Sequence, residues 1–211
     1  MSQPHGCFNR EITRPEDLYL EQPPWDIGRP QAAFVALADA GALRGRVLDI
    51  GCGTGEHALL AAGLGLDATG VDLAGNALDA ARRKARERGL QARFVRQDAL
   101  RLTEFNEQFD TVLDCGLFHL FDGDDRANYV AGLHTVLRPG GRYFMLGFCD
   151  RQPGEGGPRR LTRTDITAAF DQGWRVDSIE PATIEIANDP EAIQAWLAAV
   201  IRQSSSTAGD E

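Results

Sequence analysis

The stretch VLDIGCGTGEHALL, residues 47–60, constrains the fold of this 211-residue chain more than any other. A short apolar run ends in Asp49 and then passes through the closely spaced Gly51, Gly53 and Gly55. The residues that follow have the composition of a helix. A buried strand that leads through glycines into a helix is typical of nucleotide-binding α/β folds, in which ligands bind at the carboxyl ends of parallel strands.

Strand-like and helix-like segments alternate after this unit. Further strands are expected at 67–73, 92–99, 109–116 and 142–148, separated by helical segments such as 76–89 and 126–137. Towards the C-terminus, 174–180 and 182–187 are two strand candidates whose short link predicts a hairpin, and 190–203 is expected to form a last helix. The pattern predicts a doubly wound, Rossmann-like α/β fold, with a mostly parallel seven-stranded sheet, an antiparallel C-terminal hairpin and helices on both faces.

Length and composition indicate one soluble domain. Residues 1–29 are expected to form an N-terminal arm, 30–203 the domain, and 204–211 a disordered tail. The 31 acidic and 22 basic residues give a net charge of −9, which argues against a nucleic-acid partner. The four cysteines show no C-x-x-C pair, so we expect reduced thiols and no metal site. With no signal peptide and no apolar run of membrane-spanning length, a cytoplasmic protein without a membrane partner is expected; the oligomeric state stays open.

The charge around the glycine turn indicates which ligand it holds. Asp49 would repel a pyrophosphate, whereas it would attract a ligand with an ammonium group. Asp72 ends the second strand, where a carboxylate commonly binds ribose hydroxyls. Asp98 ends the third strand, where it could accept from an adenine amine. Ammonium, ribose and adenine without phosphate describe S-adenosylmethionine, which is the expected cofactor.

At this point the chain resembles the class I S-adenosylmethionine-dependent methyltransferases over roughly residues 25–146. The resemblance is carried by an ordered series of segments: VLDIGCGTG, GVDLAGNALDAAR, FVRQDAL, FDTVLDCGLFHLF and LRPGGRYFML. It implies a role for each matching residue: Asp49, Gly51 and Gly53 for the methionine part, Asp72 and Leu73 for the ribose, Asp98 and Ala99 for the adenine, and Asp114 near the sulfonium.

The segment YLEQPPWDIGRPQAAF, residues 19–34, resembles the front of the thiopurine and other small-molecule thiol methyltransferases. That resemblance implies that the arm folds over the cofactor and that Trp25 and Gln31 contact it. A tryptophan provides an apolar face that can cover a ligand and exclude water, and it can lie against a sulfonium. The alternative is that Trp25 only fixes the arm to the core.

On the acceptor side, His119 is the candidate general base. The alternative is a packed histidine with one ring nitrogen bonded to the backbone. Cys115 is interpreted as a small buried residue, and His57 either donates to the cofactor or lies on a solvated helix face. The charge run at 82–88 is interpreted as a solvated outer face, and the loop at 149–163 as either a lid or a mobile connection.

Together these observations predict methyl transfer from S-adenosylmethionine to a sulfur, nitrogen or oxygen atom of a small, aromatic or heterocyclic acceptor by in-line displacement. An NAD(P)-dependent oxidoreductase and a non-catalytic S-adenosylmethionine-binding module are the alternatives. A nucleic-acid methyltransferase is disfavoured, because DCGL stands where such enzymes usually carry an Asn/Asp-Pro-Pro-aromatic motif.

Overall fold

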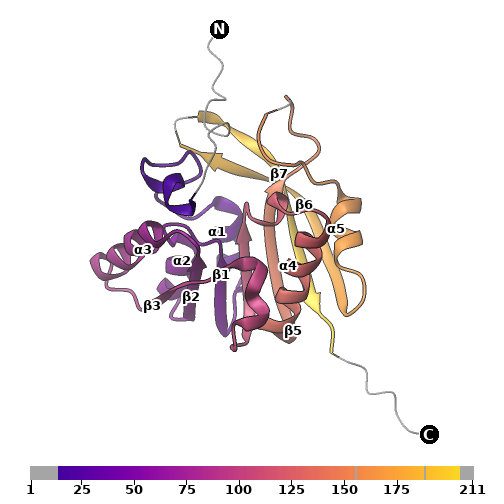
Figure 1. Cartoon of the computed structure of the whole chain (residues 1–211), viewed down its shortest axis with the longest axis horizontal. Coiled ribbons are helices and arrows are strands. Elements are labelled where there is room, and N and C mark those ends of the chain that lie inside the picture. Colours follow the sequence, from indigo (N-terminus) through magenta and orange to yellow (C-terminus); the bar gives the residue numbers. More distant parts are fainter. Residues whose placement is uncertain (1–13, 155, 188, 205–211) are drawn as a thin grey trace, which may run out of the picture.

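The computed structural model describes residues 14–154, 156–187 and 189–204. Within them the chain forms a seven-stranded sheet of order β3-β2-β1-β4-β5-β7-β6 (Figure 1). The strands are β1 (Arg46–Ile50), β2 (Asp67–Asp72), β3 (Ala92–Arg96), β4 (Phe109–Cys115), β5 (Leu137–Phe148), β6 (Trp174–Ile186) and β7 (Asp189–Arg202). Strands β1 to β5 pair in parallel, and β7 is antiparallel to both β5 and β6. The predicted fold class is therefore confirmed.

Helices cover both faces of the sheet. The helices are α1 (Ala32–Asp39), α2 (Glu56–Gly63), α3 (Gly75–Glu87), α4 (Gly123–Val136) and α5 (Arg163–Ala169), with short 3-10 helices η1 (Pro15–Tyr19), η2 (Ala99–Glu104) and η3 (Phe118–Leu120). Val47 and Phe144 pack with α1 and α2, whereas their neighbours Leu48 and Tyr143 pack with α4 and α5. Because successive residues of a strand point to opposite faces, the two helical layers lie on opposite sides of the sheet.

The strand order reverses at β1, whose neighbours are β2 on one side and β4 on the other. In the register, Asp49 lies opposite Gly70 of β2 and Leu113 of β4, and Ile50 lies opposite Asp114. The carboxyl ends of β1, β2 and β4 therefore meet at one edge of the sheet, where open α/β folds bind their ligands.

The C-terminal segment differs from the sequence prediction. Residues 190–202 of the expected helix belong to strand β7, and the expected hairpin between 174–180 and 182–187 is a single strand, β6, which continues through Pro181. In β7, Ala195 packs with the α1 side and Ala198 with the α4 side. A strand with both faces covered is apolar throughout, and periodicity does not distinguish such a run from a buried helix. Pro181 is tolerated because β6 is the edge strand.

The arm preceding α1 packs across the carboxyl ends of β1 to β3. The Asn76 side chain at the start of α3 donates to the carbonyl of Glu16 over 3.0 Å, and Arg96 at the end of β3 pairs with the Glu16 carboxylate over 3.2 Å. Residues 1–13 and 205–211 lie outside the described residues, so the predicted domain boundaries stay predictions. Within the described part of the chain, no helix has the length and apolar character needed to cross a membrane.

Candidate functional site

The glycine turn connects β1 to α2 through left-handed backbone. Gly51, Gly53 and Gly55 have φ values of 67°, 51° and 86°, a region that glycine enters without steric cost. Gly55 has a second constraint, because a Cβ there would lie 2.7 Å from the Cβ of Ala81 and 2.8 Å from the Phe94 ring. The third glycine is therefore required for packing α2 against α3 and β3, while the first two shape the turn at the sheet edge.

Asp49 is buried beneath this turn. Its Oδ2 accepts the backbone N–H of Ala58 in α2 over 3.0 Å, and its side chain is 1% exposed. Burial, together with the nearby carboxylates of Asp72 and Asp114, raises the pKa of Asp49 to about 7, against the effect of the Ala58 hydrogen bond. In the part of the chain that the structure describes, this is its one hydrogen bond, which leaves acceptor capacity unused.

Asp72 lies at the end of β2, beside the turn. Its carboxylate accepts the N–H groups of Gly53 and Ala74, each over 2.8 Å, and burial raises its pKa. Leu73, the next residue, is 38% exposed at this edge. Asp72 thus holds the glycine turn in place while remaining half-buried at the sheet edge.

Asp98 and Ala99 follow β3. The Asp98 carboxylate accepts the N–H of Leu100 over 2.9 Å and caps η2, of which Ala99 is the first residue. The structure therefore places carboxylates after three neighbouring strands, as the sequence indicated. Cofactor contact by these residues stays a prediction.

Asp114 has a different environment. It is fully buried, and it accepts the N–H groups of Leu117 and Phe118 and the hydroxyls of Tyr129 and Tyr143, both hydroxyls over 2.7 Å. Burial raises the pKa of Asp114, while the two tyrosine hydroxyls oppose that rise. Tyr143 and Tyr129 belong to the α4 side of the sheet, opposite to the α2 side on which Asp49 binds Ala58. Asp114 is thus the centre of a buried hydrogen-bond network.

The arm contributes aromatic residues over the turn. The Tyr19 hydroxyl lies against Gly53, only 2.7 Å from where a Cβ would stand. Trp25 contacts the Tyr19 ring edge-on, with centroids 6.4 Å apart, and hydrogen-bonds to its hydroxyl. Gln31 lies beyond them, and its side-chain amide exchanges two hydrogen bonds with the backbone of Glu185 in β6, over 2.9 and 2.8 Å. Gln31 therefore fixes the arm to the sheet.

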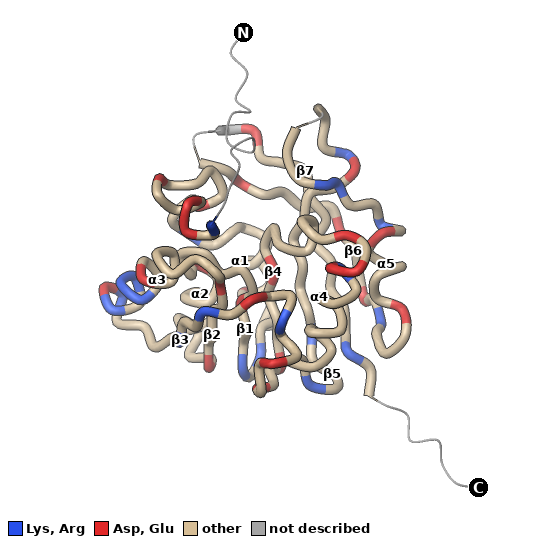
Figure 2. The backbone as a smooth tube through the Cα atoms, in the orientation of Figure 1, with Lys and Arg blue, Asp and Glu red and all other residues tan. Residues whose placement is uncertain are grey.

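A charge cluster around the buried carboxylate of Glu56 links the arm, the turn and α3. Lys84 donates to Thr54 of the turn over 2.7 Å and to the carboxylate of Glu56 over 2.8 Å, and Arg88 binds Glu56 through two nitrogens. Thr54 in turn donates to Asp26 of the arm over 2.9 Å. Basic residues gather at the outer end of α3 in Figure 2. Arg88 binds Glu56 while 40% of its side chain stays exposed, as expected for a solvated face, whereas Lys84 is 19% exposed and turns towards Glu56. Their spacing of four residues was the available signal.

The two histidines near the site are neutral and bonded to the backbone. His57 Nε2 accepts the N–H of Gln31 over 3.2 Å, and burial lowers the pKa of His57 to about 4. His119 Nδ1 accepts the N–H of Phe148 over 3.1 Å, and burial likewise lowers its pKa to about 4. Burial raises the pKa of the Cys115 thiol, which keeps it protonated.

The loop after β5 is held at its base. Leu161 pairs with Phe148 and Asp150, and Trp196 of β7 donates to Leu161 O over 3.0 Å. The guanidinium carbons of Arg151 and Arg163 each lie 4.4 Å from the centre of the Trp196 ring. These contacts fix the ends of the loop near the acceptor side.

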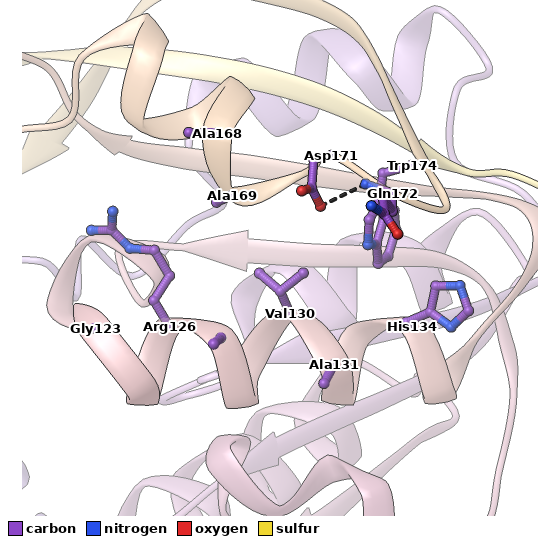
Figure 3. Close-up of a pocket in the computed structure, with 11 residues that line it drawn as sticks. Gly123, Arg126, Val130, Ala131, His134, Ala168, Ala169, Asp171, Gln172 and Trp174 are labelled. Carbon is purple, nitrogen blue, oxygen red and sulfur yellow. Dashed lines mark hydrogen bonds between the residues drawn. The ribbon is translucent and has the colours of Figure 1, made fainter.

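An open groove of about 630 Å³ lies elsewhere, between α4 and α5 (Figure 3). Val130 and His134 of α4 face Asp171 and Trp174 across it. It contains none of the residues that the sequence predicted for the site. Among the described residues, no group of three His, Cys, Asp or Glu side chains is arranged to hold a metal ion.

Comparisons with known proteins agree with this fold. Residues 47–141 match the family model described as a methyltransferase domain. The chain is 34% identical over 173 residues to the 2-heptyl-1-hydroxyquinolin-4(1H)-one methyltransferase of Mycobacteroides abscessus, covering 81% of this chain and 76% of that protein. It is also similar to a structure solved for the conversion of a disulfide bond into a thioacetal group during echinomycin biosynthesis, with 40% identity, a TM-score of 0.81 and 88% of each chain covered.

The chain therefore belongs to the class I S-adenosylmethionine-dependent methyltransferases, and it methylates a small molecule. This decides against the NAD(P)-dependent oxidoreductase. The finer resemblance to thiol methyltransferases has less support. A probable thiol methyltransferase 2 of Arabidopsis thaliana is 29% identical over 59% of this chain and 56% of its own length.

Proposed function

We propose that the enzyme transfers a methyl group to a sulfur, nitrogen or oxygen atom of an aromatic or heterocyclic small molecule. The main support for the cofactor site is the environment of Asp49, whose buried carboxylate has unused acceptor capacity directly beneath the glycine turn. An ammonium group there would supply the missing charge and donors. We assign the methionine part of S-adenosylmethionine to Asp49, Gly51 and Gly53.

The remaining cofactor contacts follow the strand ends. Asp72 and Leu73 are assigned to the ribose, and Asp98 and Ala99 to the adenine. Asp72 accepts two backbone N–H groups at one side, and a carboxylate can accept from about four directions. It can therefore bind ribose hydroxyls without releasing the turn.

The arm is assigned to cover the cofactor. Trp25 and Tyr19 lie over the glycine turn and are suited to exclude water from the sulfonium. Gln31 and Asp114 already use their polar atoms within the protein, so we assign them to positioning rather than to direct cofactor contact.

The aromatic acceptor is supported by two observations. Aromatic side chains line the acceptor side, where Phe148 packs against His119 with ring centroids 4.9 Å apart. The relative from Mycobacteroides abscessus is named for a quinolone acceptor. The net charge of −9 also favours a small molecule over a nucleic acid.

Methyl transfer requires the nucleophile, the methyl carbon and the sulfur to be held in line. The protein contributes by orienting both substrates and by excluding water. S-adenosylmethionine, held by Asp49, Asp72 and the glycine turn, would supply the methyl group. The acceptor lone pair would form the new bond to carbon, and the electron pair of the broken carbon–sulfur bond would stay on the sulfur.

Calorimetric titration with S-adenosylmethionine, S-adenosylhomocysteine and NADH tests the cofactor site. We expect the two sulfur compounds alone to bind, with a roughly 100-fold loss in Asp72→Ala, since two charge-assisted hydrogen bonds are removed. Asp79→Ala is the matched control, because Asp79 is an exposed aspartate of α3. Turnover with hydroxyquinolines, thiophenols and imidazoles then identifies the nucleophile. Equal loss in both variants would contradict the assignment of Asp72.

A further inference from the structure

His119 occupies a defined position on the acceptor side. It lies in η3, directly after β4, and is 3% exposed. Its ring contacts the edge of Phe148 at the end of β5. A Cβ on Gly116 would stand 3.6 Å from its Cε1 and 3.8 Å from its Nε2, so the absent side chain leaves this edge of the ring uncovered.

The hydrogen bonds fix which nitrogen carries the proton. Nδ1 accepts the N–H of Phe148, so the proton of the neutral ring resides on Nε2. Nε2 has no partner within the described part of the chain. Only Arg202 Nε is a fully buried, unpaired side-chain nitrogen or oxygen among those residues, so Nε2 keeps contact with solvent. A buried histidine therefore presents one free donor at the carboxyl edge of β4.

The surroundings keep this ring uncharged. The titratable and charged groups on the elements around it include Asp114 and Cys115 of β4, Cys149 after β5, and Arg126 of α4. Burial alone accounts for the lowered pKa of His119, with no contribution from these groups. Accepting a proton at Nδ1 would break the bond to Phe148 and leave a buried cation without a counter-ion.

We propose that His119 is a hydrogen-bond donor that selects an anionic methyl acceptor, and that it does not act as a general base. This inference rests on the proposed function. The acceptor loses its proton to solvent before it binds, and Nε2–H donates to the reacting atom or to an oxygen beside it. The acceptor class is thus an acidic phenol, N-hydroxy heterocycle or aromatic thiol. No proton passes to the protein in the transfer step.

Two substitutions distinguish the contributions of the two ring nitrogens of His119. His119→Asn keeps an acceptor near the Nδ1 position, and His119→Gln keeps a donor near the Nε2 position. The probes are 4-nitrophenol and 4-nitrothiophenol, whose anions absorb visible light, each titrated into enzyme saturated with S-adenosylhomocysteine. We expect the anions to bind to wild type and, within about fivefold, to His119→Gln, but at least tenfold more weakly to His119→Asn.

The result that would overturn the proposal is equal anion binding by both variants, binding of the neutral probes, or binding of neither probe. A direct measurement needs no acceptor at all. Nuclear magnetic resonance of 15N-histidine-labelled enzyme should show His119 protonated on Nε2 and free of titration between pH 5.5 and 8.5. Titration near neutrality, or a proton on Nδ1, would return His119 to the role of base.

Failure of the proposed function would be visible separately. If S-adenosylhomocysteine does not bind to wild type, the assignment of the cofactor site is wrong. If it binds but the His119 measurements give the contrary results, only the assignment of His119 as a donor is wrong.

Discussion

Asp49 and Asp114 lie next to the last residues of two adjacent strands and are both almost completely buried, yet their oxygens are used differently. Asp114 accepts from two backbone N–H groups and two tyrosine hydroxyls, whereas Asp49 accepts from Ala58 alone among the described residues. A saturated carboxylate stabilises the fold around it. A buried, ionised carboxylate with few donors is costly, and a ligand that supplies a cation offsets that cost.

The largest expected effect is the loss of the Asp114 network. In Asp114→Asn one carboxylate oxygen becomes an NH2 group. Either both tyrosine hydroxyls lose the Oδ2 acceptor, or the Leu117 N–H loses the Oδ1 acceptor and faces a second donor, and the bonds that remain lose the carboxylate charge. We expect the free energy of unfolding to fall by about 4–5 kcal/mol in urea denaturation. Tyr129→Phe, which removes a single donor, should cost about 1 kcal/mol. A similar cost for both variants would show that Asp114 is not the centre of the network.

Substitution of Asp49 should instead raise the free energy of unfolding. Its folded pKa of about 7 lies above its ordinary value of 3.8, so ionisation destabilises the fold. This destabilisation is absent below pH 4, grows as the pH rises and is complete above pH 7. Asp49→Asn should therefore stabilise the free enzyme by up to about 4 kcal/mol at pH 8 and hardly at all at pH 4.

Thermal melts of wild type and Asp49→Asn at pH 4, 6 and 8 provide the measurement. Asp49→Asn should also lose the stabilisation that S-adenosylmethionine gives to wild type. A gain in stability that is the same at all three pH values would mean that the charge of Asp49 is not its cause.

Cofactor affinity should depend on pH through the same carboxylate. Below pH 7 most Asp49 is protonated, and an ammonium ligand must displace that proton. Binding of S-adenosylmethionine should therefore strengthen about tenfold between pH 5.5 and 7, while the ligand's own amino group remains charged. Calorimetry in two buffers of different ionisation enthalpy would count the released proton. In Asp49→Asn the affinity should be weak and independent of pH.

The smallest change in stability is expected at the charge cluster around Glu56, which links the arm, the turn and α3. Lys84→Met removes the donors to Thr54 and Glu56, but Arg88 still binds Glu56 through two nitrogens. We expect a loss of about 1 kcal/mol in the free energy of unfolding, measured in urea. Arg83→Met, on the exposed pair with Glu87, is the matched control and should change stability by less than about 0.5 kcal/mol.

The parts of the molecule that the sequence predicted well are those set by neighbouring residues. The turn through Gly51, Gly53 and Gly55 and the carboxylates at Asp72 and Asp98 follow from strand ends and backbone conformation, which are local properties. The element order then implies the parallel sheet, because a strand, a crossover and a parallel strand connect in one preferred way.

The parts that could not be predicted depend on residues far apart in the chain. Residues 190–202, expected as a helix, form a strand because β5 and β6 offer them two partners. The proton of His119 is placed by the N–H of Phe148, which lies 29 residues away. Likewise, Lys84 turns inward because Glu56 is buried 28 residues before it.

The course of β6 has a consequence for the behaviour of the protein at high concentration. A long outer strand presents a row of free N–H and C=O groups with which another chain can pair. In β6 this row is interrupted by Pro181 and by shifts of register at Val176/Ser178 and Ile184/Ile186. The same irregularities that hid the strand in the sequence therefore end the sheet at its seventh strand and protect the enzyme from edge-to-edge aggregation.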